Sequence, residues 1–181
     1  PQIEITFGML TLEAQADTSV AITGADLGAT LNDRSITPWQ TYAIKKGDIL
    51  AFHQPVWGLR AYLAVKGGFL CEPTLGSVAT VMREKIGGLT GKGDKLQKGD
   101  RLIYQAGTEH QQRSVPRLAI PDYSQTEIPV ILGYQYQSFS VLERANFFSS
   151  DYKVSSNSDR MGYRLEGQEV HSNLKGIISE G

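Results

Sequence analysis

The sequence is poor in cysteine, in long apolar runs and in net charge, and each of these absences excludes a class of protein. Cys71 is the single cysteine, so no disulfide can form within the chain, and its place after an apolar strand favours a buried structural role over a nucleophile. No stretch approaches the roughly 18 apolar residues of a membrane helix. The formal net charge of -1 gives no general attraction to nucleic acid or anionic membranes. We therefore expect a cytoplasmic protein whose partners include neither.

Several catalytic signatures are missing as well. The sequence contains no Gly-x-Ser-x-Gly elbow, no His-Glu-x-x-His, no cysteine pair and no Gly-x-Gly-x-x-Gly. The glycine-rich loop at 87–94 is not a P-loop, because Ile86 stands where the first glycine belongs and glycine follows Lys92. The three histidines are far apart in the sequence, which leaves a triad or a zinc site open without indicating one. We predict no metal site.

The segment at residues 58–77 is the feature around which the chain is organised. Its first half alternates between an apolar set, Leu59, Ala61, Leu63 and Val65, and a second set, Arg60, Tyr62, Ala64 and Lys66. Because successive side chains of a strand point to opposite faces, this pattern predicts a half-buried strand. Gly67 and Gly68 end it, since residues without Cβ readily take positive φ. The other face offers Arg60 and Tyr62 as candidate substrate contacts.

Short β signals continue along residues 1–104, each bounded by Gly, Asp, Asn or Pro. We predict strands at 3–7, 10–14, 19–23, 42–44, 49–52, 60–65 and 101–104. Such spacing is typical of a barrel or a sandwich. The tripeptide Lys-Gly-Asp stands at 46–48 and again at 98–100, and we interpret both copies as turns that lead into a strand rather than as a duplication.

Beyond residue 108 the sequence becomes polar and proline-rich, which predicts a connector. The predicted organisation is a first β lobe at 1–115, a connector at 116–128 and a second unit at 129–181, with a short helix at about 139–148 and a strand-like segment at 163–165. The fold class that follows is mainly β.

In two segments, polar residues have either a structural role or a ligand-binding role. In the small-residue stretch 23–29, the Asp26 carboxylate either closes an Asx turn or orients a ligand. If residues 155–167 are extended, Arg160 and Arg164 share one face, with Cα atoms about 13 Å apart. That separation is too large for both to clamp one small carboxylate. They then either hold two ends of a larger anion or brace a loop through salt bridges.

Six stretches, taken in order, match a known pattern. They are Thr23-Gly24-Ala25-Asp26, the Trp39 segment, Lys46-Gly47-Asp48-Ile49-Leu50, residues 58–65 with Gly67-Gly68, Leu75-Gly76-Ser77 and, above all, Ser158-Asp159-Arg160-Met161-Gly162-Tyr163-Arg164-Leu165. They resemble the biotin-dependent carboxyltransferase-domain family, and the likeness covers nearly the whole chain. This family includes allophanate hydrolase subunit 2, the KipI antagonist KipA, the C subunit of 5-oxoprolinase and a carboxyltransferase portion of urea carboxylase.

The resemblance implies two cyclophilin-like β-barrel lobes, with this chain starting inside the first and ending inside the second. The Gln-Asp-x-Gly-Arg-x-Gly signature that family members usually carry near the N-terminus is not in this sequence. The site that this signature helps to build would then be incomplete, and the isolated chain is expected to be inactive.

The resemblance also implies a hydrolase subunit that acts with ATP, a KipI-like (subunit-1) companion and a LamB/YcsF-like third subunit to open 5-oxoproline to glutamate. Opening a resonance-stabilised lactam needs donors around the developing oxyanion and phosphate. We nominate Arg160 and Arg164 as catalytic donors, Asp26 as orienter or base, and Arg60, Tyr62, Ser158 and Asp159 as substrate-binding residues. The site is expected where the polar faces of 59–65 and 158–167 come together.

Two other functions fit the same resemblance. One is a regulatory module that binds a KipI-like inhibitor without turnover. The other is a carboxyltransferase domain of a biotin-dependent urea carboxylase, in which arginine would hold a carboxybiotin or substrate carboxylate. The latter requires a biotin-carrying Met-Lys-Met-type segment, which does not occur in this sequence.

Overall fold

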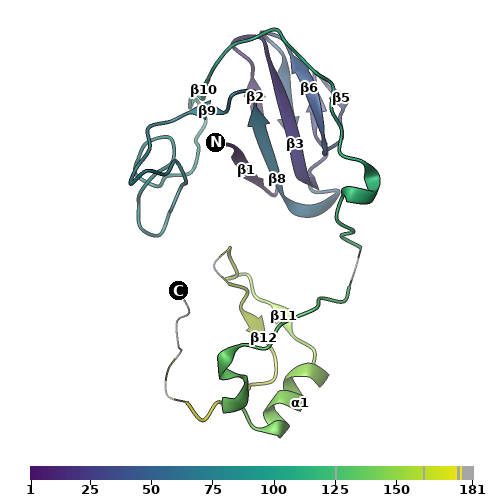
Figure 1. The fold of residues 1–181 in the computed structure, drawn as a ribbon, viewed down its shortest axis with the longest axis vertical. Coiled ribbons are helices and arrows are strands. Elements are labelled where there is room, and N and C mark those ends of the chain that lie inside the picture. Colours follow the sequence, from purple (N-terminus) through teal and green to yellow (C-terminus); the bar gives the residue numbers. More distant parts are fainter. Residues whose placement is uncertain (125, 161, 175, 177–181) are drawn as a thin grey trace. The chain divides into compact units, whose positions relative to one another are not determined.

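The chain divides into two units, Pro1–Ser124 and Gln125–Gly181, in the computed structural model. The structure describes residues 1–124, 126–160, 162–174 and 176 (Figure 1). Strands dominate, and α1 (Val141–Ser149) is a single short α-helix among the described residues, so the predicted mainly β class is confirmed.

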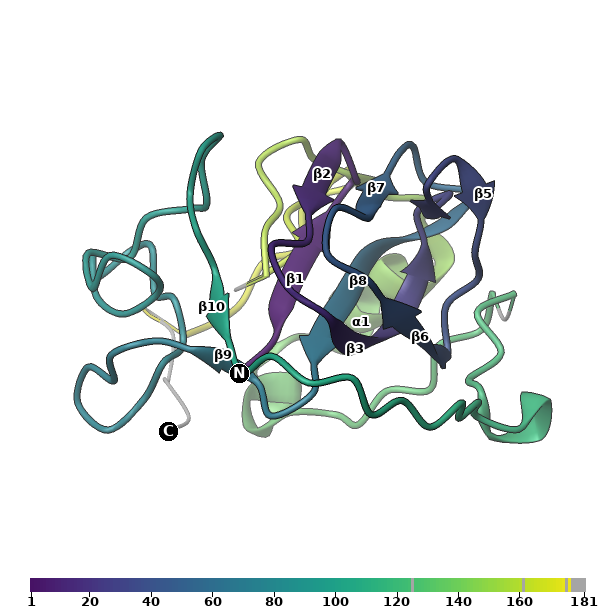
Figure 2. The same cartoon turned by 90° about the horizontal axis from the view of Figure 1, so that it is seen from above.

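Two four-stranded antiparallel sheets form the first unit (Figure 2). One sheet has the order β1-β8-β3-β6 and consists of β1 (Ile3–Thr6), β8 (Trp57–Val65), β3 (Thr18–Asp26) and β6 (Gln40–Ile44). The other has the order β2-β7-β4-β5 and consists of β2 (Leu10–Glu13), β7 (Ile49–Phe52), β4 (Thr30–Leu31) and β5 (Arg34–Ser35). A short pair, β9 (Phe69–Leu70) with β10 (Ile103–Tyr104), and the 3₁₀ helix η1 (Arg117–Ala119) complete the unit.

The core lies between the two sheets and takes side chains from both. Its most deeply buried large members are Ile22, Leu27, Phe52 and Leu63. Ala61, Leu63 and Val65 are buried as the alternation predicted, whereas Leu59 is 43% exposed and that part of the prediction is wrong. The register between β3 and β8 shifts between Gly24 and Asp26, so the regular two-residue alternation ends before Leu59.

Strand existence was predicted better than strand ends. The segment 49–52 matches β7. Residues 24–26, which lie beyond the predicted strand 19–23, also belong to β3, because pairing with β8 continues through the register shift. The two-residue strands β4 and β5 were not predicted, since two residues carry no periodicity.

Both Lys-Gly-Asp segments are turns, as predicted. Gly47 and Gly99 have φ of 89° and 95°. Asp48 Oδ2 accepts a hydrogen bond from Lys45 N at 2.7 Å, and Asp100 Oδ2 accepts one from Gln97 N at 2.8 Å. The same local chemistry therefore builds the same turn twice.

The Asp17 carboxylate binds Lys45 and Lys46 at the first of these turns and should make the stability of the first unit depend on pH. The Lys46 backbone N–H, and then the Lys45 ammonium at 3.0 Å, hold the pKa of Asp17 below its ordinary value. A carboxylate whose pKa is lowered by folding stabilises the protein above its unfolded pKa, about 4, and loses this contribution as the pH falls through the folded pKa. Asp17→Asn should therefore lower Tm at pH 7, and the deficit should shrink as the pH falls below about 4 and through the folded pKa. Thermal unfolding across this range measures the deficit, with the exposed Asp33→Asn as the control for loss of one charge. A deficit that does not shrink as the pH falls would contradict the prediction.

The second unit contains η2 (Tyr134–Ser138), α1 and a hairpin of β11 (Lys153–Val154) and β12 (Leu165–Glu166). The predicted helix is confirmed, and it begins at an N-cap, because Ser140 Oγ accepts a hydrogen bond from Glu143 N at 3.1 Å. Within the described part of the chain, no helix has the length and apolar character that a membrane crossing requires.

Candidate functional site

In the first unit, Arg60 and Tyr62 lie on the outer face of β8, opposite the core residues Ala61 and Leu63. Tyr62 lies opposite Glu4 of β1 in the strand register, and Arg60 Nε lies 3.6 Å from Glu4 Oε1. This distance makes an ion pair but not a hydrogen bond, and Arg60 Nε has no hydrogen-bond partner in the described structure although it is buried. The guanidinium therefore sits beside a carboxylate that already balances its charge.

Asp26 ends β3, and its side chain is engaged locally. Its Oδ1 accepts a hydrogen bond from Gly28 N at 2.9 Å. Of the two alternatives given for Asp26, this contact is the Asx turn. Gly24, two residues before it, has a φ of +83°, and a Cβ there would lie 2.5 Å from Arg60 O and 3.1 Å from the Tyr62 ring. Glycine thus lets the Tyr62 ring pack directly against β3.

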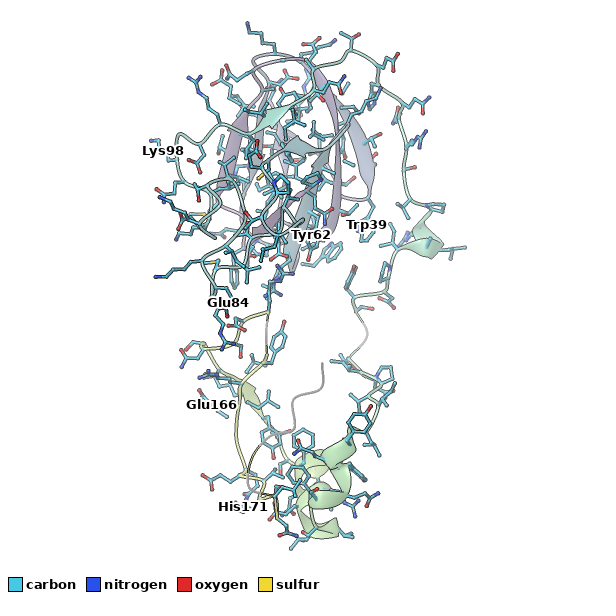
Figure 3. All side chains as sticks on the ribbon, turned by 60° about the vertical axis from the view of Figure 1, so that its left-hand side comes forward. Trp39, Tyr62, Glu84, Lys98, Glu166 and His171 are labelled. Atoms are coloured by element: carbon cyan, nitrogen blue, oxygen red, sulfur yellow. The ribbon has the colours of Figure 1, made fainter. Side chains whose placement is uncertain are left out.

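Trp39 is a feature that the sequence analysis met only as part of the family pattern. Its backbone N–H donates to Ile22 O at 2.6 Å, and its carbonyl accepts from Val115 N at 2.9 Å. Its Nε1 is buried and has no hydrogen-bond partner among the described residues, which is unusual for a tryptophan. Figure 3 shows Trp39 and Tyr62 toward the same end of the first unit.

In the second unit, the residues nominated from the strongest motif lie on the loop of the β11–β12 hairpin. The extended conformation expected for 155–167 is wrong, since strand pairing is limited to β11 and β12 and the loop is closed by its own hydrogen bonds. Ser155 N donates to Arg164 O at 2.8 Å, and Asp159 N donates to Gly162 O at 3.1 Å. Met161, which belongs to the same motif, lies outside the described residues.

Ser158 and Asp159 hold this loop in shape. Ser158 Oγ accepts a hydrogen bond from Arg164 N at 2.9 Å and donates to Arg164 O at 3.3 Å. Asp159 Oδ1 accepts from Gly162 N at 3.2 Å. The hairpin therefore brings Ser158 against the Arg164 backbone, while the Arg160 and Arg164 side chains belong to exposed residues.

The nominated residues fall into two sets. Asp26, Arg60 and Tyr62 belong to the first unit, and Ser158, Asp159, Arg160 and Arg164 belong to the second. Each set is gathered within its own unit. No group of three or more His, Cys, Asp or Glu side chains that could hold a metal ion occurs among the described residues.

A further pair was not predicted. Ser19 Oγ and His110 Nδ1 lie 2.8 Å apart, although 91 residues separate them in the sequence. They line a pocket of about 900 Å³ on the outer face of the sheet β1-β8-β3-β6. No signal in the sequence marks this pair, because neither residue stands in a motif.

Comparison with known proteins decides the family. All of residues 1–181 match the carboxyltransferase domain, subdomain A and B. The chain belongs to this family. The recognition made from the motifs is thereby confirmed.

The similar proteins carry two kinds of name, the C subunit of 5-oxoprolinase and urea carboxylase. The chain is 34% identical to the C subunit of 5-oxoprolinase from Haemophilus influenzae, over 94% of this chain and 53% of that protein. It is 36% identical to the Escherichia coli protein of the same name, over 93% of this chain and 53% of the relative. The chain thus spans about half the length of these curated relatives. Among solved structures, Kluyveromyces lactis urea carboxylase is 26% identical, with a TM-score of 0.73 over 94% of this chain and 16% of that one.

Proposed function

We propose that this carboxyltransferase-domain chain is part of a 5-oxoprolinase-type enzyme that opens 5-oxoproline to glutamate with ATP, together with a KipI-like companion and a LamB/YcsF-like subunit. The observation that carries the proposal is the identity of 34% and 36% to two proteins named as the C subunit of 5-oxoprolinase, across nearly the whole of this chain.

The exposed arginines of the β11–β12 loop supply the donor chemistry that such a reaction needs. A lactam carbonyl and a phosphate both present oxygens that guanidinium N–H groups bind well. Among the described residues, no carboxylate pairs with the Arg164 guanidinium, which leaves it able to receive an anion. This donor set suits a phosphate-bearing ligand, and ATP, when bound, would supply the free energy for opening the ring.

In this proposal each nominated residue has a separate task. Arg160 and Arg164 bind the anionic groups, and Ser158 and Asp159 fix the loop that carries them. In the first unit, Tyr62 and Arg60 offer substrate contacts, and Asp26 orients the backbone around Gly28.

Arg160→Ala should reduce turnover about a hundredfold, the effect expected for loss of one donor to a developing charge. The assay uses the full-length protein with both companions and follows glutamate and ADP together. Lys153→Ala, which removes an exposed cation from the neighbouring strand β11, serves as the matched control and should leave the rate unchanged. A fully active Arg160→Ala complex would remove this residue from the site, whereas a wild-type complex without turnover of 5-oxoproline would overturn the function itself.

The likeness to urea carboxylase supports a second candidate, a carboxyltransferase domain that works with biotin. The same arginines would then hold a carboxylate instead of a phosphate. Carboxyl transfer from carboxybiotin to urea, measured with the full-length protein and a biotin-carrying partner, separates this candidate from the first.

A further inference from the structure

A strap of residues 107–113 crosses the outer face of the sheet β1-β8-β3-β6 and is fastened at both ends. At one end, Gly107 N donates to Asp17 O at 2.9 Å. At the other end, Thr41 N donates to Arg113 O at 2.9 Å and Thr41 Oγ1 donates to Gln111 O at 2.8 Å. The strap is therefore held by Asp17, which directly precedes β3, and by Thr41 of β6.

Small side chains on the sheet leave space between the sheet and the strap. Ala64 of β8 pairs with Ala21 of β3, and Ala21 pairs with Thr41 of β6, so two methyl groups and one threonine lie side by side across three strands. The pocket of about 900 Å³ lies here, within the size range of small-molecule sites. Its floor is apolar, and its walls come from the polar strap.

The walls of this pocket carry more positive than negative charge. Lys66 and Arg113 line it as cations, and Glu109 is the single carboxylate among its lining residues. Lys66 Nζ binds Glu109 Oε2 at 2.8 Å, and this contact lowers the pKa of Glu109, so that carboxylate is ionised and already neutralised. Arg113 donates from Nη2 to the neutral Gln111 Oε1, and no described carboxylate pairs with it. Among the described lining residues, the Arg113 guanidinium is therefore a positive charge that no carboxylate neutralises.

His110 adds a second polar group that is held in place. Ser19, which is 8% exposed, has its Oγ 2.8 Å from His110 Nδ1, so this contact fixes the imidazole at the pocket wall. Because Nδ1 is engaged, Nε2 is the ring nitrogen that can bind a ligand, and it carries the proton in the tautomer in which Ser19 Oγ–H donates to Nδ1.

We propose that this strap pocket, formed by Ala21, Ala64, Ser19, His110 and Arg113, binds a small cyclic carboxylate. The Arg113 guanidinium takes the carboxylate, His110 Nε2 donates to it, and the ring lies on the methyl groups of Ala21 and Ala64. All residues that line the pocket belong to the first unit. The pocket itself stands on this geometry, whereas the choice of a cyclic carboxylate as its ligand rests on the proposed function.

Binding is tested by titrating the whole chain, labelled with ¹⁵N, with two cyclic carboxylates, benzoate and L-5-oxoproline. Their neutral analogues, benzamide and 2-pyrrolidone, are titrated in parallel. Saturable shifts of the amide signals of Ala64, Lys66 and residues 108–113 are expected with at least one carboxylate and not with its neutral analogue. Arg113→Gln should weaken that binding about tenfold, since it removes a charge-assisted hydrogen bond. Arg117→Gln, which removes a cation outside the pocket, should not weaken it.

Three results would overturn the proposal: no saturable shifts with either carboxylate, equal binding of the neutral analogues, or full affinity in Arg113→Gln. Thermal unfolding of both variants shows that each is folded, so a loss of binding in Arg113→Gln alone reports on the pocket. Because the readout is binding and not turnover, failure here leaves the 5-oxoprolinase assay to be judged by itself.

Discussion

Gly8→Ala should destabilise the first unit by about 3 to 5 kcal/mol, the sum of a left-handed backbone penalty and a steric clash. Gly8 has a φ of +81°, and a Cβ there would overlap the carbonyl oxygen of His53. That contact is with backbone, so no side-chain rotation can relieve it. Relief requires the start of β2 and the end of β7 to separate, which also strains the hydrogen bond from Met9 N to His53 O at 3.2 Å.

Gly47→Ala separates the two causes. Gly47 has a similar φ of +89°, but nothing lies within 4 Å of the position its Cβ would take. It should therefore cost only the backbone penalty, about 1 to 2 kcal/mol. Urea unfolding followed by tryptophan fluorescence measures both variants in the relevant unit, because the two tryptophans, Trp39 and Trp57, belong to it. Equal losses for Gly8→Ala and Gly47→Ala would contradict the clash.

Leu27→Ala should destabilise the same unit by about 3 kcal/mol, within the range for buried leucine truncations. The Leu27 side chain is 1% exposed and packs in the core with Ile22, Phe52 and Leu63. Its backbone carbonyl accepts a hydrogen bond from His53 N at 2.8 Å, which holds the residue in place and prevents the core from collapsing around the lost atoms. The cavity term therefore adds to the lost burial.

Leu118→Ala is the matched control, because it makes the same chemical change in the same unit at a side chain that is fully exposed, with a relative exposure of 102%. Its effect should stay within about 0.5 kcal/mol. The same fluorescence measurement applies. A Leu27→Ala variant as stable as Leu118→Ala would show that this core does not depend on Leu27.

Local sequence patterns predicted those parts of the fold that depend on neighbouring residues. The alternation of Ala61, Leu63 and Val65 identified the buried face of β8, and glycine at 47 and 99 identified two turns. The α1 helix was predicted because its apolar residues are spaced within ten positions of the chain, and the structure adds the N-cap at Ser140. Leu59 was assigned wrongly, because the register shift opposite it depends on β3, a different part of the chain.

The candidate site residues show the same limit. The family pattern identified Ser158 to Arg164 by type and order, but the assumption of an extended strand placed them on the wrong kind of element. Their loop is closed by the hydrogen bonds of Ser158 and Asp159, which a two-residue periodicity cannot reveal. For Asp26, the sequence offered an Asx turn or a ligand contact, and the structure shows the turn.

By itself, the sequence determined the mainly β class, the family and the turns, because these depend on side-chain periodicity, on motif order and on glycine at positions of positive φ. Only the tertiary structure decided which residues meet. Ser19 and His110 lie 91 positions apart, and they come together because the strap is fastened to Asp17, next to β3, and to β6 above two alanines. Such contacts follow from strand register and chain path, which are set by the packing of the whole unit and not by any local stretch.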